Sequence, residues 1–413
     1  MSAYLDNSAT TKPEEAVAKK VYQMLTEHFG NPSSFHKEGL DANAEVRRAR
    51  EIIAKSLSCE NEELFFTSGG TEANNLAIFG SAMANKRKGN RIVTTAIEHE
   101  SVLESVAELE KQGFEVIRLE PNSDGNISEE QIFEAVNSDT ILVSMMYVNN
   151  EVGSVLPVKS IRKAVKKAKA PALVHIDCVQ AYGKYEIKPA KLGADLVTIT
   201  AHKVHGPKGT GALYIKKGTR IVPRTYGGEQ EHKIRPGTEA SPLIAGFGEA
   251  VSLFPDLKKQ TAEIHELNAY ARTELEKIDG VQINNSTDSS DYILNVYIPS
   301  FMTSQTIVQH LSSQYGVYVS NGSACAKGKK SHVLTAMKLG DKVIEKSIRI
   351  SFSRMNTKAD VDELVAAVRE TVIWMGQQVC TVIISAKAIR CSLMPAWTKW
   401  MKLYEVSDKN DIF

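Results

Sequence analysis

Short apolar runs that end in polar or glycine-rich residues recur along the chain and alternate with stretches of helical periodicity. The runs are ELFFTSGG, RIVTTAIEHE, TILVSMMYVNNEVG, ALVHIDCVQA, ADLVTITAHK and GALYIKKG. Between several of them, as in SVLESVAELEKQG and VKSIRKAVKKAKA, apolar residues return every three or four positions, which is typical of helices. This alternation predicts an α/β fold in which helices cover both faces of a mainly parallel sheet.

The pattern changes near Pro242, where a long helical stretch without any strand begins. We expect a bend or break at Pro255, because proline removes a helical hydrogen bond. Strand-like ILNVYIP and SIRISFS then alternate with the helical SQTIVQHLSSQYG and KADVDELVAAVRETVIWMG. We therefore predict a large domain over residues 14–250, a smaller α+β domain formed by residues 1–13 and 251–376, and an atypical tail over residues 377–413.

Charge and composition restrict the classes of partner. The 413 residues include 50 Lys and Arg against 49 Asp and Glu, a net charge of +1, so no overall field favours nucleic acid or an acidic membrane surface. The N-terminal MSAYLDNSATT lacks the pattern of a secretory signal, and no apolar stretch approaches the roughly 18 residues of a membrane span. The five cysteines have no CxxC spacing. We expect a cytoplasmic protein with a small-molecule substrate and no resident metal.

Polar residues follow the predicted strands at the edge where open α/β sheets bind ligands. SGGTEANNLAI follows a strand and opens a helix, so the backbone near Gly70 and Thr71 suits an anion, although a simple chain reversal would use the same glycines. Other strands end at His99, at Asn150, and at Asp177. A lone histidine or aspartate at such a place is more often a helix cap, but several such ends together predict a concave polar site.

The stretch TITAHKVHGPKGTGAL adds a lysine, Lys203, between a strand and a glycine-rich turn. Lysine, histidine, a buried carboxylate and an anion cradle are together what pyridoxal 5'-phosphate requires. The lysine binds the aldehyde, the carboxylate pairs with the ring nitrogen, and the helix N-terminus holds the phosphate. An exposed lysine in a turn is the alternative, and the glycines that allow close approach of a ligand weigh against it.

The chain resembles the NifS/IscS-type cysteine desulfurases, which are class V pyridoxal-phosphate enzymes of fold-type I, over roughly residues 3–375. The matching segments are, in order, YLDNSATT, NPSSFHKEG, FTSGGTEANNLAI, EHESV, NNEVG, HIDCVQA, TAHKVHGPKGTGALY, GGEQEHKIRPGTE, SNGSAC and RISFSR. The resemblance implies a large domain with a mainly parallel seven-stranded sheet, and a smaller α+β domain that carries the active-site cysteine.

The resemblance also implies the role of each site residue. Lys203 matches the Schiff-base lysine, Asp177 the partner of the ring nitrogen, and His99 the imidazole that stacks on the ring and shuttles protons. Gln180 would lie near the ring hydroxyl, Asn150 at the cofactor and substrate, and Arg349 and Asn7 at the substrate. The implied phosphate contacts are Gly70, Thr71, Thr200, His202 and a neighbouring subunit's Thr238. The match at Thr238 implies a homodimer.

Cys325 lies in SNGSACAKGKK, among small, polar and lysine residues. This composition predicts an exposed flexible loop and a thiol whose pKa is lowered by neighbouring charge. By the resemblance, Cys325 takes sulfur from L-cysteine, releases L-alanine, and passes its persulfide to an iron–sulfur scaffold protein or a tRNA-thiolation enzyme. Its only implied metal contact is as a transient ligand of an iron–sulfur cluster.

Two other functions remain open from the sequence. One is another class V reaction, namely an aminotransferase or a selenocysteine lyase. The other is a non-catalytic subunit that binds pyridoxal phosphate and acts as a scaffold. In the tail, basic residues alternate with Trp397, Trp400 and Met401, a pattern that a membrane-surface or partner-binding helix would share. An added segment or altered terminus is the interpretation we favour.

Overall fold

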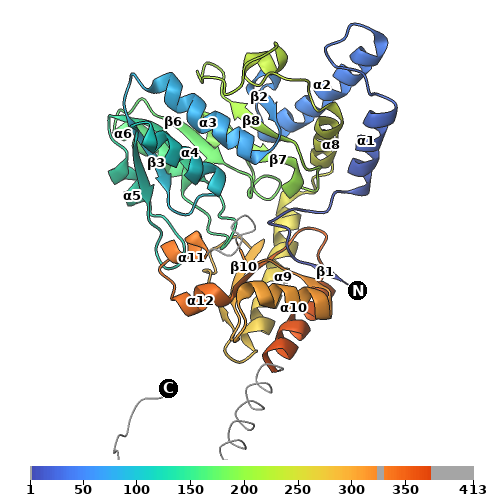
Figure 1. Cartoon of the computed structure of the whole chain (residues 1–413), viewed down its shortest axis with the longest axis vertical. Coiled ribbons are helices and arrows are strands. Elements are labelled where there is room, and N and C mark those ends of the chain that lie inside the picture. Colours follow the sequence, from blue (N-terminus) through green and yellow to red (C-terminus); the bar gives the residue numbers. More distant parts are fainter. Residues whose placement is uncertain (1, 323–329, 374–413) are drawn as a thin grey trace, which may run out of the picture.

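The computed structural model describes residues 2–322 and 330–373 (Figure 1). Cys325 and the predicted tail 377–413 lie outside the described residues. Figure 1 shows one part built on a large sheet and, below it, a second part built on a small sheet. Within the described ranges, no helix is both long enough and apolar enough to cross a membrane.

The large sheet has seven strands in the order β2-β8-β7-β6-β5-β3-β4. Only β8 runs antiparallel to its neighbours, so the predicted mainly parallel sheet is confirmed. The sequence pattern missed the edge strand β4, because it is not a continuous apolar run. Its first four residues are not buried, and they include the charged Glu115 and Arg118. The strands are β2 Leu64–Thr67, β3 Arg91–Thr95, β4 Glu115–Leu119, β5 Thr140–Met146, β6 Leu173–Asp177, β7 Leu196–Thr200 and β8 Gly211–Ile215.

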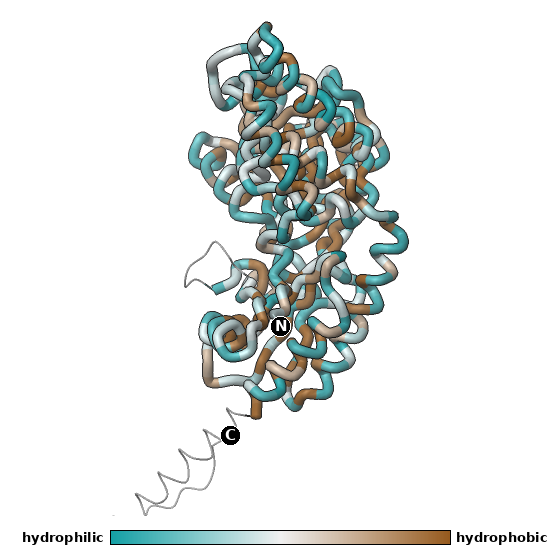
Figure 2. The backbone as a smooth tube through the Cα atoms, turned by 90° about the vertical axis from the view of Figure 1, so that its right-hand side faces the viewer, coloured by the Kyte–Doolittle hydropathy of each residue, from teal (hydrophilic) through white to brown (hydrophobic). Residues whose placement is uncertain are grey.

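Helices cover both faces of the large sheet, and successive strand residues point to opposite faces. Ile92 and Leu142 belong to the core beneath α3 (Gly70–Asn85) and α4 (Glu100–Lys111). The next residues, Val93 and Val143, belong to the core on the other face. The tube in Figure 2 shows hydrophobic segments running through the interior. The other helices of this part are α1 Glu15–Thr26, α2 Lys37–Leu57, α5 Glu129–Ala135, α6 Val158–Lys167, α7 Pro189–Leu192, α8 Ser241–Ser252, and the short 3-10 turns η1 Asn61–Glu63, η2 Ala201–Lys203 and η3 Gln230–Lys233.

The small sheet has the order β12-β10-β9 and is antiparallel. Its strands are β9 Gln282–Ile283, β10 Ile293–Tyr297 and β12 Ser347–Ser351. The predicted break at Pro255 is confirmed, because α8 ends at Ser252 and α9 begins at Leu257. The helices here are α9 Leu257–Glu276, α10 Ser304–Tyr315, α11 His332–Ala336 and α12 Asp341–Lys346, and residues 358–373 are also helical.

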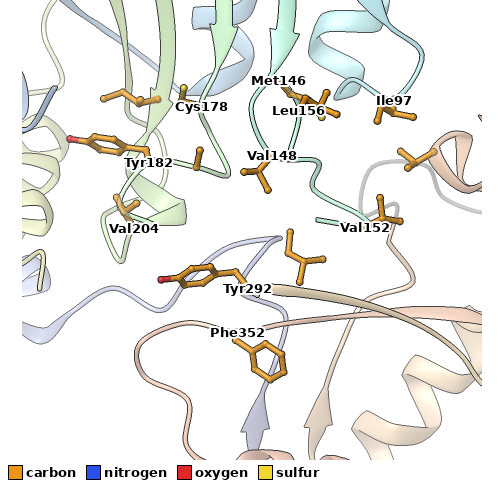
Figure 3. Close-up of a cluster of buried hydrophobic side chains, with 14 of the residues drawn as sticks. Ile97, Met146, Val148, Val152, Leu156, Cys178, Tyr182, Val204, Tyr292 and Phe352 are labelled. Carbon is orange, nitrogen blue, oxygen red and sulfur yellow. The ribbon is translucent and has the colours of Figure 1, made fainter. Parts of the chain in front are cut away.

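The N-terminal arm joins the part built on the small sheet. Strand β1 (Ala3–Tyr4) pairs in parallel with β11 (Val317–Tyr318), and Asp6 forms a bridge with Ser351. A single hydrophobic core connects the two parts, because Val148 and Val152 lie in one cluster with Tyr292 and Phe352 (Figure 3). The domain limits at 14–250, 1–13 and 251–376 stay a prediction.

Candidate active site

A cavity of about 270 Å³ opens at the carboxyl ends of the parallel strands, where the small-sheet part and the arm close its other side. This size is close to the lower end of small-molecule sites, about 300 Å³. Residues at or just beyond the ends of strands β2, β3, β5, β6 and β7 line it: Gly70, Thr71, His99, Asn150, Asp177, Gln180, Thr200, His202 and Lys203. The opposite side consists of Ser8, Ala9, Gly322, His332 and Arg349.

Lys203 ends the short turn η2 directly after β7. Its Nζ donates to the backbone oxygen of Ala9 at 2.9 Å and also to that of Ser8. The arm fixes this loop from outside, because the amide N–H of Thr11 donates to the His202 oxygen at 2.8 Å. The lysine is therefore held in the cavity by backbone of a segment nearly two hundred residues earlier, which the sequence pattern did not indicate.

Asp177 is buried at the end of β6. Its Oδ2 accepts from Asn74 Nδ2 at 2.7 Å, and its Oδ1 accepts from the Val179 amide at 2.9 Å. Burial raises the pKa of Asp177, although both hydrogen bonds and the nearby His99 and Lys203 oppose the shift. A cationic ring nitrogen beside this carboxyl would stabilise its ionised form. Sequence reasoning missed Asn74, whose signal is an asparagine inside a helix, where its propensity is poor.

His99 both caps a helix and lines the cavity, so the two interpretations from the sequence hold together. Its Nδ1 accepts from the Ser101 amide at 3.1 Å at the start of α4. The neutral ring therefore carries its proton on Nε2. Burial lowers the pKa of His99, while the Asp177 carboxylate opposes the shift and Lys203 adds to it.

The opening of α3 lies at the cavity, where Gly70 and Thr71 line it, and an anion site here stays a prediction. Gly69, just before the helix, has φ of 152°, a conformation that favours glycine. A Cβ at Gly70 would lie 3.0 Å from Val179 Cγ2, so the backbone passes close to the turn after β6.

Burial lowers the pKa of His202 to about 3, with Lys203 adding to the shift, so the ring is neutral and can donate one N–H.

Arg349 lies in β12 and is 1% exposed. Its Nη2 forms an ion pair with Asp6 Oδ1 at 2.8 Å. Its Nη1 donates to the backbone oxygens of Asn150 at 2.8 Å and Gly322 at 3.2 Å. The buried Nε of Arg349 forms no hydrogen bond with the described residues. The guanidinium is thus fixed at the cavity wall with a donor group still available to a carboxylate.

Three predicted site residues do not line the cavity of the described chain. Asn7 Nδ2 instead donates to the Ser351 oxygen at 2.9 Å and to Asn356 Oδ1 at 3.0 Å, while the adjacent Ser8 and Ala9 reach the cavity. Thr238 is exposed. Cys325 lies outside the described residues, between Gly322 on the cavity wall and Lys330.

Besides Asn74, sequence reasoning missed His332 and Glu151, which also line the cavity. His332 Nε2 donates to the Glu98 backbone oxygen at 2.9 Å. Glu151 Oε2 accepts from Ser331 Oγ at 2.6 Å, and burial raises the pKa of this carboxyl. Glu151 lies within the matching segment NNEVG, whereas His332 lies outside the matching segments, and only the tertiary fold brings the two residues to the same cavity.

The donor set fits pyridoxal 5'-phosphate. An amine, a buried carboxyl that a cation would ionise, a neutral imidazole and a helix N-terminus surround one cavity. These are the groups that this cofactor needs for its aldehyde, ring nitrogen, ring face and phosphate.

Comparison with known proteins agrees with a pyridoxal-phosphate site. Residues 3–364 match the family model of class-V aminotransferases. The chain is 40% identical to cysteine desulfurase IscS of Methanosarcina thermophila, over 90% of this chain and 92% of the relative. A solved NifS-like protein has a TM-score of 0.84 at 35% identity, covering 91% of this chain and all of that one. The solved complex of SspA with cysteine has a TM-score of 0.75 at 32% identity, covering 85% and 98% of the two chains.

Proposed function

The chain belongs to the class-V aminotransferase family and, within it, to the pyridoxal-phosphate-dependent cysteine desulfurases, and on this premise we propose that L-cysteine gives its sulfur to Cys325. The observation that carries the proposal is the placement of Lys203 and Asp177 at strand ends, with Arg349 on the opposite wall of the same cavity. A cofactor held by the first two residues then faces a substrate held by the third.

The residues that would hold the cofactor belong mainly to the sheet. Lys203 would bind its aldehyde carbon through Nζ, Asp177 its ring nitrogen, and His99 one face of its ring. When bound, the cofactor accepts the electrons of a bond that breaks at the substrate α-carbon. Gln180 would contact the ring hydroxyl and Asn150 the cofactor and substrate, and the phosphate would lie among Gly70, Thr71, Thr200, His202 and, in a homodimer, Thr238 of the partner subunit.

The remaining steps belong to side chains of this chain. Arg349 binds the substrate carboxylate, since its guanidinium has planar donors suited to two oxygens. Lys203, once displaced by the substrate amine, takes the α-proton. His99 presents Nε2–H and gives a proton back to product, because its Nδ1 is engaged by Ser101.

Sulfur transfer forms one bond and breaks another. The Cys325 thiolate attacks the substrate sulfur, forming S–S as the Cβ–S bond breaks, and the carbon skeleton takes protons to leave as alanine. The persulfide on Cys325 is passed to an acceptor protein in the cytoplasm, either an iron–sulfur scaffold or a tRNA-thiolation enzyme. An exchangeable sulfur requires a thiolate that is accessible.

The test is to incubate the protein with L-cysteine, quantify alanine, and locate the persulfide by mass spectrometry of the peptide around residue 325. Cys325→Ala should keep cofactor absorbance and lose persulfide. The matched control is Cys59→Ala, because burial raises the pKa of Cys59 to about 12 and makes it a poor nucleophile. Alanine without sulfur on Cys325 contradicts the proposal. Sustained amino transfer by Cys325→Ala would indicate an aminotransferase.

A further inference from the structure

Lys184 is a buried lysine in the turn region after β6 that no step above uses. It is 7% exposed, and in the described part of the chain it forms no ion pair. Its Nζ donates to Gln180 Oε1 at 3.3 Å and lies 5.2 Å from the centre of the Tyr292 ring. Burial lowers the pKa of Lys184 to about 8, and Arg349 adds to the shift. Burying an amine costs free energy, so the presence of Lys184 at this place needs an explanation. Its contact with Gln180 offers one.

Gln180 links Lys184 to the catalytic lysine. Its Nε2 donates to the Ser8 backbone oxygen at 2.9 Å. The same oxygen accepts from Lys203 Nζ. With Oε1 directed to an N–H donor and Nε2 to a carbonyl, the amide has only one favourable orientation, because the flipped amide would place donor against donor and oxygen against oxygen.

A second, small cavity of about 20 Å³ lies between Lys184 and Lys203. Gln260 lines it, and its buried Oε1 has no partner among the described residues. The volume suffices for one water molecule. A water there would accept from Lys184 and donate to Gln260 Oε1, so the amine can stay buried while one of its N–H groups is directed at Gln180.

The orientation of Gln180 decides what it offers to a ligand. An amide nitrogen carries two hydrogens, and only one is used by Ser8. Gln180 also lines the main cavity, so its second N–H is the group available there. An N–H group that donates to an oxygen stabilises the deprotonated, charged form of that oxygen more than its protonated form. The hydrogen bond therefore lowers the pKa of the oxygen.

We propose that Lys184 is a positioning residue that holds the Gln180 amide so that its N–H, and not its oxygen, faces the ring oxygen of the bound cofactor. This inference rests on the proposed function. Lys184 thereby favours the deprotonated ring oxygen without contacting the cofactor itself.

The test uses the holoenzyme and the pH dependence of its cofactor absorbance. Lys184→Met keeps the length of the side chain and removes its donor, so the amide of Gln180 can turn. The midpoint of the absorbance change should move up by about one pH unit, the size expected for one hydrogen bond to a charged group. Lys191→Met, which alters an exposed lysine, should leave the midpoint unchanged.

A double-mutant cycle separates this role from a general charge effect. In a Gln180→Leu background, Lys184→Met should produce no further shift. The titratable or charged groups that also face Lys184, unchanged in all variants, are Lys203, His205, Tyr292, Arg349 and Arg354. An unchanged midpoint in Lys184→Met, or an equal shift in both backgrounds, overturns the inference. Lys184→Leu serves if the methionine variant does not fold, and a wild-type protein that binds no cofactor refutes the proposed function instead.

Discussion

The two walls of the cavity are built in different ways. The sheet wall takes its groups from the ends of strands, such as Asp177, or from positions a few residues beyond them, such as Lys203, so local chain order places them. The opposite wall depends on contacts like that of Arg349 with Asp6, which lie 343 residues apart. The first wall is prepared by the sheet topology, whereas the second exists only when both ends of the chain have come together.

The largest effect should come from the sheet wall. Lys203→Ala removes the amine that binds the cofactor and takes the α-proton, so turnover should fall by at least about 1000-fold. The cofactor absorbance typical of a lysine adduct should also disappear. Lys216→Ala, an exposed lysine at the end of β8, is the matched control. Residual turnover near the wild-type level would exclude Lys203 as the catalytic lysine.

Arg349→Lys tests the opposite wall. A lysine cannot replace the fork that contacts Asp6, Asn150 and Gly322, so kcat/KM for L-cysteine should fall about 100-fold, mainly through KM. Cofactor absorbance should stay as in wild type if the walls act separately. Arg118→Lys, in an exposed ion pair with Glu110, controls for the loss of a guanidinium. A changed spectrum with an unchanged KM would show that the walls are not separable.

Glu98→Gln tests how a buried carboxyl next to the sheet wall responds to pH. Glu98 Oε1 accepts from Thr95 Oγ1 and the Met146 amide, and its buried Oε2 has no partner among the described residues. Burial raises the pKa of Glu98 from 4.5 to about 8, so the folded protein binds more protons than the unfolded chain between these values. The wild type should therefore lose stability as pH rises from 4.5 to 8.

Glutamine keeps the acceptor and cannot ionise. The variant should be more stable than wild type at pH 8 by about 4 kcal/mol of apparent unfolding free energy, with little difference at pH 4.5. Urea unfolding at the two pH values measures this. Equal pH dependence of both proteins would mean that Glu98 does not titrate in this range.

The smallest effect should come from Asp6→Asn. Asp6 neutralises part of the Arg349 charge that a substrate carboxylate would otherwise use. Removing it should lower the KM for L-cysteine about two- to fivefold, the scale of a partly exposed ion pair. Steady-state kinetics at low and high salt would detect this, and the difference should shrink as salt rises. A raised KM would mean that Asp6 mainly orients the guanidinium.

The predictions from sequence succeeded where the spacing of apolar residues determines the helices and strands, and with them the places of the side chains that follow. The mainly parallel sheet, the break at Pro255 and the convergence of His99, Asp177 and Lys203 follow from strand and helix patterns, whereas the count of seven strands came from the family resemblance. The family resemblance, not the pattern, supplied Arg349. Asn74, His332 and Glu151 could not be placed, because their partners lie in other elements. Asn7 shows the limit, since its neighbours Ser8 and Ala9 reach the cavity while its own amide faces Ser351.

The pairing of the N-terminal arm with β11 and β12 also sets an order of events during synthesis. Residues 2–13 leave the ribosome long before their partners at Val317, Tyr318 and Ser351. Since domains fold as their residues emerge, the large sheet can form while the arm still waits for its partners. The backbone oxygens of Ser8 and Ala9 reach Lys203 from this arm. A nascent chain should therefore acquire its cofactor late, after β12 has been made.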